Sequence, residues 1–404
     1  MIERPQYVNE IMKYMDKPFV KILTGVRRSG KLTIMLMIKE QLRQKGIQEE
    51  RILHYNFDSL QYENMKNSRA LYEMLSEKLK KSKNRVYLFF DEIQEVQDWE
   101  KVVNSLMIDF DTDIYVTGSN SRMMSSEIAT YLTGRYISFH IYPLSFREYL
   151  TFTKQYRALE DIYKEFLSYV TAGGFPATHL YTMDDEERYA IVKDIYNSTI
   201  FSDIVKRAQI RKVDQLERIV KYVFDNVGNT FSVSNISKYL KSQNRSIHVE
   251  TIYEYLKCLE NAYIIQRCAR YDIKGKEILK TQEKFYLADP AFQYSVLGYR
   301  MDSFSNMLEN IVYLELRRNG YDVYVGKIDT AEIDFVAIKR NEKVYIQITQ
   351  EISQKTTQER EYGNLLEIHD NYPKYVLRTD TWAKGNYEGI HTMHIADFLL
   401  LEKY

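Results

Sequence analysis

One stretch decides the fold of this chain, Gly25-Val26-Arg27-Arg28-Ser29-Gly30-Lys31-Leu32-Thr33. It follows an apolar run at residues 19–23 and precedes a helix-like segment at residues 34–45. This order has the form of a phosphate-binding loop, G-x-x-x-x-G-K-[ST]. In such a loop the glycines let backbone N–H groups turn towards an anion, the lysine ammonium reaches the outer phosphates, and the helix adds the positive end of its dipole. The stretch therefore predicts a nucleotide site.

One position of this loop departs from the pattern. The residue after the lysine normally offers a hydroxyl to Mg²⁺, whereas here Leu32 follows Lys31 and Thr33 comes one place too late. Phosphate binding depends on the backbone amides and the ammonium, so we expect it to survive. The usual metal ligand is missing, which puts Mg²⁺ affinity and turnover in doubt.

A pair of carboxylates closes a second predicted strand. Residues 85–90, RVYLFF, have the apolar pattern of a buried strand, and Asp91 and Glu92 follow directly. In a parallel sheet this end of the strand faces the phosphate site. The pair has the form of a Walker B element, in which Asp91 would hold the Mg²⁺ shell through water and Glu92 would polarise the attacking water. The alternative is a solvated acidic turn.

Two further polar groups follow along the chain. Residues 113–117, DIYVT, predict a third strand that ends in the cluster Gly118-Ser119-Asn120-Ser121. Ser119 or Asn120 is a natural sensor of the γ-phosphate, although the same residue types also suit a turn or a helix cap. Arg135, in the run YLTGRY, supplies a guanidinium that would stabilise charge on a transferred phosphate, and a surface role is its alternative.

Composition and charge narrow the class of protein. A chain of 404 residues suggests two or three domains of about 150 residues. Its 56 basic and 56 acidic residues give no net charge, so binding to nucleic acid or an acidic membrane needs a local patch. No segment approaches the roughly 20 apolar residues of a membrane span, and the start MIERPQYV lacks a signal peptide's apolar core. We expect a cytoplasmic protein without a membrane partner.

These motifs together resemble those of a known family. The runs that carry the resemblance are GVRRSGK, LFFDEIQEVQDWE, VTGSNS, YLTGRY, PLSFREYL, TAGGFP, YDIKGKEIL and KFYLAD. They cover most of the chain, which resembles the bacterial and archaeal AAA-type ATPases that carry a DUF4143 domain. The resemblance implies ATP with Mg²⁺, and a homo-oligomer, since a neighbouring subunit often supplies the arginine in AAA-type sites. By motif it assigns the nucleotide contacts, the Walker B pair and the sensor to Gly25, Gly30, Lys31, Asp91, Glu92 and Asn120.

A winged helix is predicted between residues 151 and 275, after a helical segment. Its three helices and its strand pair are expected at 215–227, 234–241, 249–260, 263–267 and 270–271. The last two of these helices would form a helix-turn-helix. In such domains the second helix of the motif, here 249–260, enters the major groove, and flanking cations bind phosphates. The cations near these elements are Lys238, Lys241, Arg245, Arg267, Arg270, Lys274 and Lys276. They suggest double-stranded DNA as a partner, and a protein-docking module is the alternative.

The last third of the chain resembles the PD-(D/E)xK nuclease core. In that core a helix Glu, a hairpin Asp and an E-x-K on the next strand bind Mg²⁺ and position water. Glu309 and Asp334 match the first two positions, whereas the third reads Gln347-Ile348-Thr349. An amide is a weaker ligand for a hard cation, and the lysine is missing. We therefore expect a nuclease-like fold without efficient cleavage, and the alternative is that both acids are merely buried or hydrogen-bonded.

The predicted fold class is α/β, with three domains. These are an AAA-like P-loop NTPase domain with a parallel sheet at 1–150, a helical segment and winged helix at 151–275, and a DUF4143, nuclease-like α/β domain at 276–404. The predicted function is Mg²⁺-dependent ATP hydrolysis, with the nucleotide state (ATP or ADP) controlling how the C-terminal domains engage a partner. Two alternatives stay open: a nucleotide-binding switch with little turnover because of Leu32, and a metal-dependent nuclease regulated by ATP.

Overall fold

The computed structural model describes residues 2–121, 131, 132, 134–243, 245, 247–298, 300, 303–350, 355–380 and 384–404, without the side chains of 280–282 and 355–360. Contacts divide the chain into two compact units. The first is Met1–Ile141 with Asn261–Tyr263, and the second is Tyr142–Glu260 with Ile264–Tyr404. The predicted limit at residue 150 lies close to the first boundary, and the limit at 275 lies inside the second unit. The three-domain division stays a prediction.

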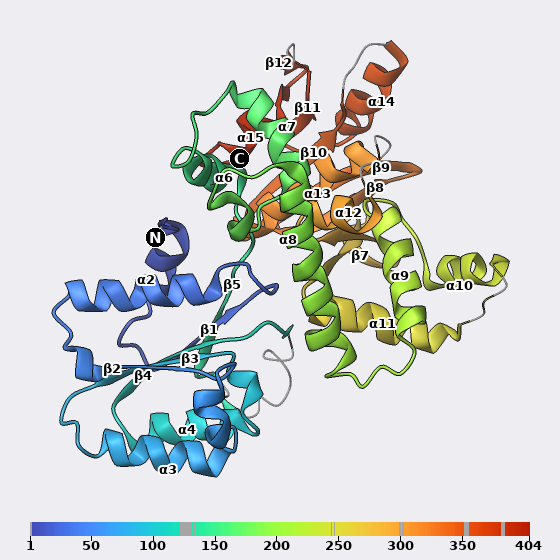
Figure 1. Cartoon of the computed structure of the whole chain (residues 1–404). Helices are drawn as coiled ribbons and strands as arrows, with labels where there is room; N and C mark the ends of the chain where they lie inside the picture. Colours follow the sequence, from blue (N-terminus) through green and yellow to red (C-terminus); the bar gives the residue numbers. More distant parts are fainter. Residues whose placement is uncertain are drawn as a thin grey trace. The chain divides into compact units, whose positions relative to one another are not determined.

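The first unit is built on a parallel sheet of five strands in the order β2-β3-β4-β1-β5 (Figure 1). The strands are β1 (Val20–Thr24), β2 (Ile52–Asn56), β3 (Val86–Asp91), β4 (Thr112–Thr117) and β5 (Tyr136–His140). The strands predicted at 19–23, 85–90 and 113–117 are confirmed to within one residue at each end. The predicted fold class, a parallel α/β sheet followed by a helical and mixed α/β region, is also confirmed.

Helices cover both faces of this sheet (Figure 1). They are α1 (Pro5–Met12), α2 (Lys31–Gln44), α3 (Ser68–Leu79) and α4 (Trp99–Asp109), with the 3-10 turns η1 (Glu49–Arg51), η2 (Leu60–Met65) and η3 (Ile93–Glu95). Successive side chains of a strand point to opposite faces, so Phe90 packs with the cluster under α3 and α4, and Phe89 with the cluster under α1 and α2. Both faces are buried, which explains the continuous apolar runs of the strands.

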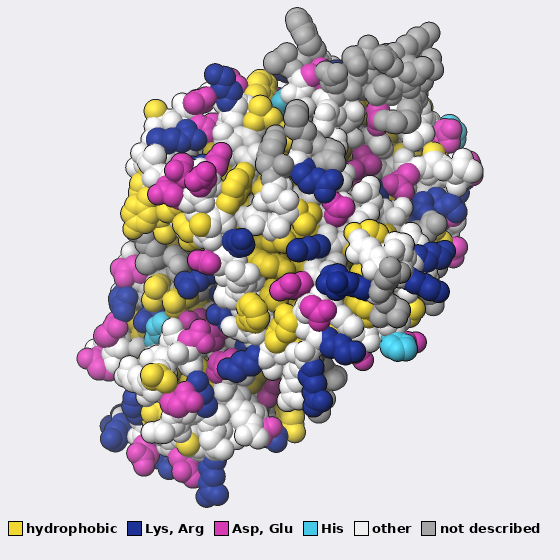
Figure 2. Space-filling model, turned by 45° about the vertical axis from the view of Figure 1, so that its right-hand side comes forward, with side chains coloured by type: hydrophobic (Ala, Val, Ile, Leu, Met, Phe, Trp, Pro, Cys, Tyr) yellow, Lys and Arg dark blue, Asp and Glu magenta, His cyan; other side chains and the backbone are white. Residues whose placement is uncertain are grey.

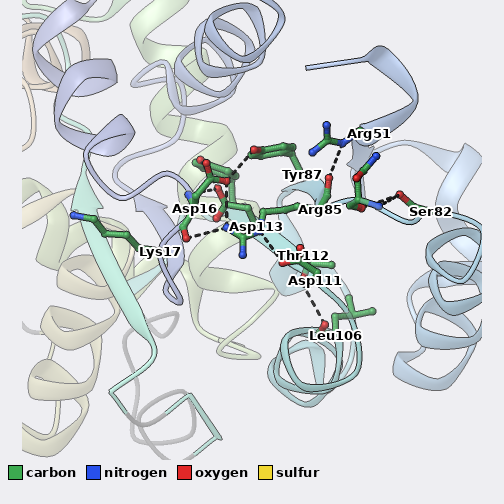
Figure 3. A network of polar contacts seen from close by, with 12 residues as sticks. Asp16, Lys17, Arg51, Ser82, Arg85, Tyr87, Leu106, Asp111, Thr112 and Asp113 are labelled. Carbon is green, nitrogen blue, oxygen red and sulfur yellow. Dashed lines mark hydrogen bonds and ion pairs between the residues drawn. The ribbon is translucent and has the colours of Figure 1, made fainter. Parts of the chain in front are cut away.

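A buried ion pair joins β1 and β4 near their amino-terminal ends. Lys21 Nζ donates to Asp113 Oδ1, and the two side chains are 0% and 1% exposed. The other Asp113 oxygen accepts from the Asp16 backbone N–H and the Tyr115 hydroxyl, both at 3.0 Å. Figure 3 shows Asp113 and Asp16 in a wider network that includes Tyr87, whose hydroxyl donates to Asp16 at 2.8 Å. Burial lowers the pKa of Lys21, and Asp113 partly offsets this effect.

The second unit is built on a mixed sheet of eight strands in the order β12-β13-β11-β10-β9-β8-β6-β7. The strands are β6 (Ile265–Asp272), β7 (Glu277–Leu287), β8 (Asp322–Ile328), β9 (Ala331–Lys339), β10 (Glu342–Ile348), β11 (Lys374–Arg378), β12 (Lys384–Tyr387) and β13 (Ile390–His394). β6 and β7 form an antiparallel hairpin, and β6 also pairs in parallel with β8. The segments predicted as the strand pair of the winged helix, 263–267 and 270–271, therefore do not pair with each other, because both fall in β6, whose antiparallel partner is β7. This hairpin belongs to the same sheet as the last third of the chain.

Most helices of the chain follow residue 141. They are α6 (Phe146–Thr153), α7 (Ile162–Ala172), α8 (Asp185–Ser198), α9 (Val213–Asp225), α10 (Val233–Ser242), α11 (Val249–Asn261), α12 (Ala291–Leu297), α13 (Phe304–Arg318), α14 (Lys355–Leu366) and α15 (Ile395–Leu399), with the 3-10 turn η5 (Pro176–His179) and the π-helix η6 (Thr199–Val205). The helices predicted at 215–227, 234–241 and 249–260 are confirmed, with no end shifted by more than two residues. None of the helices described combines the length and the apolar character that crossing a membrane requires.

Two of the quoted motifs, TAGGFP and KFYLAD, meet at Asp289. Its carboxylate accepts hydrogen bonds from the backbone N–H groups of Gly174 at 2.7 Å and Ala291 at 2.9 Å. A Cβ atom at Gly173 would lie 1.9 Å from Asp289 Oδ1, and one at Gly174 would lie 2.3 Å from the Leu144 carbonyl oxygen. The glycine pair is thus needed for close backbone approach. Both motifs have a structural role in the second unit.

Candidate functional site

The predicted phosphate loop lies between β1 and α2, at the carboxyl end of a strand inside the sheet. Gly25 and Gly30 have φ angles of 139° and 100°, in the region that favours glycine. A Cβ atom at Gly25 would lie 2.2 Å from the Ile141 carbonyl oxygen, so a side chain there would require the backbone to shift. Arg28 is also left-handed, with a φ angle of 66°. The loop has the tight turn that the glycine pattern predicts.

Lys31 opens α2 and is only 5% exposed. Its ammonium donates hydrogen bonds to the backbone oxygens of Gly25 at 2.9 Å and Val26 at 3.1 Å. The positive charge therefore lies against the loop, next to the amino-terminal end of α2, where the helix dipole has the same sign. Both features favour an anion at this point.

The residues beside the lysine decide which metal ligands the loop offers. Leu32 is 37% exposed and carries no oxygen on its side chain. Thr33 is half-buried and lies about 100° further around the helix. Ser29 is fully buried, and its hydroxyl has no hydrogen-bond partner among the residues described. The loop fits a phosphate chain, but Leu32 offers no oxygen at the position that normally coordinates Mg²⁺.

The predicted Walker B carboxylates lie at the end of β3, beside the end of β4. Thr117 Oγ1 donates to Asp91 Oδ1 at 2.5 Å and accepts from the Glu92 backbone N–H at 3.0 Å. Burial raises the pKa of Asp91 to about 6, while the Thr117 hydroxyl and the Lys31 ammonium lower it and Glu92 raises it. Asp91 is therefore close enough to the loop lysine for their charges to interact. A carboxylate at this position could hold the water shell of a metal ion.

Glu92 has an unusual backbone and an oriented side chain. Its φ angle is 50°, a left-handed conformation that is uncommon outside glycine. Its Oε2 accepts hydrogen bonds from the Gln94 side-chain amide and, at 3.4 Å, from the Ser119 hydroxyl. A strained residue held by its neighbours is frequent at functional sites. Ser119 thus links the end of β4 to the predicted base.

Asn120 and Arg135 lie at opposite ends of the parallel strands. Asn120 directly follows Ser119, is 4% exposed and lies at the same end of the sheet. Arg135 is exposed and precedes β5, and its backbone oxygen accepts from the Val20 N–H at 2.8 Å. Since β5 runs parallel to β1, Arg135 lies at the opposite edge from the loop. Arg135 therefore lies away from the loop of its own chain, and its role in phosphate transfer stays a prediction.

Two residues at this site were not singled out in the sequence, although Thr117 lies in the quoted run VTGSNS. Arg4 is 1% exposed, donates from Nη1 to the Ser29 carbonyl oxygen at 2.8 Å and lies over the Tyr7 ring at 4.6 Å. Thr117 holds both residues of the predicted Walker B pair. A hydroxyl that closes an apolar strand was a weak signal for Thr117. For Arg4 the sequence held no signal, because its contact depends on how α1 packs.

Comparison with known proteins agrees with this geometry. A family model described as an AAA domain matches residues 17–150, and one described as a domain of unknown function, DUF8612, matches residues 163–303. An uncharacterized protein of Haemophilus influenzae is 38% identical over 403 residues, which are 99% of this chain and 99% of that one. The chain belongs to a P-loop ATPase family of the AAA type. The sequence prediction of an AAA-type ATPase is confirmed at this level.

More distant relatives add little about function. An uncharacterized protein of Methanocaldococcus jannaschii is 32% identical to this chain over 359 residues, 85% of this chain and 77% of that one. Among solved structures, the ORC1 protein of Aeropyrum pernix in complex with DNA has a TM-score of 0.37 and 10% identity, covering 73% of this chain and 92% of that one. A likeness this low carries no functional argument. The matched downstream model is DUF8612, so the DUF4143 assignment stays a prediction.

The cations predicted to bind DNA divide into two groups in the structure. Arg267, Arg270 and Lys274 each pair with a carboxylate of the second unit. The others are exposed: Lys238, Lys241, Arg245 and Lys276. Over the face shown in Figure 2, basic and acidic side chains are interspersed. The exposed face of α11, the helix that would enter the groove, includes Glu250, Glu254 and Lys257. Its acidic residues do not favour a phosphate backbone.

The residues singled out by the nuclease pattern come together in the second unit. Glu309 lies on α13, Asp334 on β9 and Gln347 on β10. Gln347 Oε1 accepts from the Asp334 backbone N–H at 3.4 Å. Burial raises the pKa of Asp334, and the nearby charge of Glu309 raises it further. The pattern therefore predicted that these three residues lie close together. Whether they bind a metal ion depends on the side chains around them.

Proposed function

We propose that this protein binds ATP at residues 25–33 and hydrolyses it with Mg²⁺. One observation carries the proposal: Lys31, Asp91 and Glu92 come together at the carboxyl end of the parallel strands. There the charges of Lys31 and Glu92 both shift the pKa of Asp91. Phosphoryl transfer to water needs a cation for the phosphates, a ligand for the metal shell and a group that orients the water. These three side chains supply that set.

Each residue then has a distinct role. The loop amides and Lys31 would bind the phosphates, Glu92 would polarise the attacking water, and Ser119 or Asn120 would sense the γ-phosphate. Mg²⁺, when bound, neutralises charge on the phosphates, and Asp91 would hold it through water. The state of the nucleotide would then alter how the second unit engages a partner.

Phosphate release from Mg²⁺–ATP tests this proposal directly. Turnover should be lost in Lys31→Ala and in Glu92→Gln, while Glu92→Gln should still bind ATP because the loop is intact. Lys45→Ala, an exposed lysine at the end of α2, is the matched control and should keep wild-type turnover. Turnover that survives both site substitutions would show that the phosphate release comes from elsewhere.

A nucleotide-binding switch with little turnover is the second candidate. The observation that favours it is Leu32, which is 37% exposed and offers no oxygen where the pattern places a hydroxyl. Leu32→Ser should then raise Mg²⁺-dependent hydrolysis well above the wild-type rate, and Leu32→Val should not. An unchanged rate in Leu32→Ser would mean that this position does not limit turnover.

Two partners are also proposed, double-stranded DNA and further copies of the chain. Lys238 and Lys241, exposed on α10, support DNA binding, and Arg135, exposed away from the loop of its own chain, supports an arginine given to a neighbour. DNA affinity should fall in Lys238→Ala/Lys241→Ala and persist in Lys80→Ala/Lys81→Ala, two exposed lysines elsewhere.

For the oligomer, Arg135→Ala should reduce turnover at concentrations where gel filtration shows association. A monomeric, active enzyme would refute it.

A further inference from the structure

A buried lysine lies beside Glu309, which the nuclease pattern marks as a metal ligand, and beside a further acid, Glu332. Lys284, on β7, is 4% exposed. Its ammonium lies 3.2 Å from Glu309 Oε2 and 2.9 Å from Glu332 Oε1. The pattern expects a lysine two residues after the position of Gln347, and this chain has none there. The lysine beside these acids therefore comes from β7, whereas the pattern expects it on the strand of Gln347, β10. We call this cluster of Lys284, Glu309, Glu332, Asp334 and Gln347 the centre.

The carboxylates of this centre already have donors from the protein. The Tyr286 hydroxyl donates to Glu309 Oε2 at 3.1 Å. Asp334 Oδ2 accepts from a backbone N–H of β10 at 2.7 Å. Arg270 Nη2 lies 3.6 Å from Glu332 Oε2. Buried acids require such compensation, and here side chains and backbone of the chain itself provide it.

A divalent cation fits this arrangement poorly. Mg²⁺ demands oxygen ligands at about 2.1 Å in octahedral geometry, and an ammonium among those oxygens would repel it. Gln347 contributes a neutral amide in place of a third carboxylate. Within the part of the chain that is described, no group of three or more histidine, cysteine or acidic side chains is arranged to hold a metal ion.

We propose that the Lys284 ammonium takes the place of the divalent cation in this centre and closes it to metal. It compensates the charges of Glu309 and Glu332 as a metal would. A protonated ammonium offers no coordination site, so it cannot generate a metal-bound hydroxide for phosphodiester cleavage. On this proposal the ion pairs of Lys284 prevent metal-dependent cleavage, which argues against an ATP-regulated nuclease.

Mn²⁺ binding to the full chain without nucleotide tests this proposal. All variants are made in a parent protein that carries Asp91→Asn, which removes the proposed metal ligand of the AAA domain. Lys284→Met and Lys284→Gln remove the charge, and Lys284→Arg keeps it as the matched control. We expect millimolar Mn²⁺ to raise the melting temperature of both neutral variants by about 2 °C or more, since a ligand that binds the folded state stabilises it. The parent and Lys284→Arg should show no rise.

Further variants locate the metal that is gained. Adding Glu309→Gln to Lys284→Gln should abolish the rise in melting temperature. Mn²⁺ binding to the parent that disappears with Asp334→Asn would overturn the proposal, because a metal would then fit beside the lysine. Folded neutral variants that bind no Mn²⁺ would overturn it as well. If neither neutral variant folds, Mn²⁺ binding to the parent with and without Asp334→Asn still shows whether a metal ion fits beside the lysine.

Discussion

Thr117 Oγ1 donates a hydrogen bond of 2.5 Å to Asp91 Oδ1. The same hydroxyl accepts from the Glu92 backbone N–H at 3.0 Å. Two neighbouring parallel strands, β3 and β4, are thereby joined at the end that faces the phosphate loop. One hydroxyl orients both residues of the predicted Walker B pair, so its removal should disturb both without touching the loop.

Thr117→Val is the variant that isolates this hydroxyl. A hydrogen bond to a charged group contributes about 1.5–3 kcal/mol, so we expect kcat to fall by roughly 10- to 100-fold. Nucleotide binding by the loop should be retained, and Thr117→Ser should restore most of the rate because it keeps the donor. Equal kcat in Thr117→Val and wild type would show that Asp91 needs no such partner.

Turnover should fall as the pH drops through about 6. Burial raises the pKa of Asp91 to about 6, and the protonated acid is a poor ligand for the metal shell. Because the folded pKa lies above the unfolded value of 3.8, Asp91 contributes less stability as pH rises between about 4 and 6. Its protonation therefore does not unfold the protein.

The pH–rate profile at saturating Mg²⁺–ATP is the measurement, with circular dichroism as the check on folding. Thr117→Val should move the acidic limb to higher pH, since the Thr117 hydrogen bond lowers the pKa of Asp91. A profile that stays flat from pH 5 to 8 in a folded enzyme would contradict the assignment of Asp91.

Gln94 should act as a positioning residue for Glu92. Its amide donates to Glu92 Oε2, which fixes the position of the carboxylate. Gln94→Ala should lower kcat by about 10-fold with KM for ATP unchanged, because the loss acts on the water and not on the phosphates. The exposed Gln97 lies in the same segment, so Gln97→Ala is the matched control. A rise in KM with constant kcat would assign Gln94 to nucleotide binding instead.

The ion pair between Lys21 and Asp113 should dominate the stability of the first unit. Lys21→Met leaves a buried carboxylate without its counter-charge, which costs about 3–5 kcal/mol in the free energy of unfolding. Urea unfolding measures this loss, and Lys21→Met/Asp113→Asn should recover part of it. Arg69→Met breaks a pair with Glu73 whose side chains are 87% and 61% exposed, and should cost far less stability because solvent screens the pair. Similar losses in the two single variants would refute the role of burial.

Local patterns predicted most of the AAA domain. The loop at 25–33 and the acidic pair after residue 90 are contiguous in sequence, and their chemistry depends on neighbours along the chain. Apolar runs predicted the parallel strands, because a sheet buried on both faces leaves few polar positions. The helices between residues 213 and 261 followed from their spacing for the same local reason.

Other relationships were beyond any local pattern. Arg135 looked like part of the site because it follows the other motifs, but the direction of β5 places it at the far edge. The strand pair predicted at 263–267 and 270–271 was wrong, because both segments fall in the single strand β6, which pairs with β7 and with β8. Strand order and direction decide both points, and they arise from packing over long sequence distances.

The sequence by itself determined that this is an AAA-type protein with a phosphate loop, because that loop needs only adjacent residues. It also determined that Leu32 replaces a hydroxyl and that Gln347 replaces an acid. Only the tertiary structure decided that Thr117 meets Asp91 and that Lys284 lies among the carboxylates of the second unit. Those contacts join different strands and helices, and which side chains meet there depends on how the chain folds back on itself.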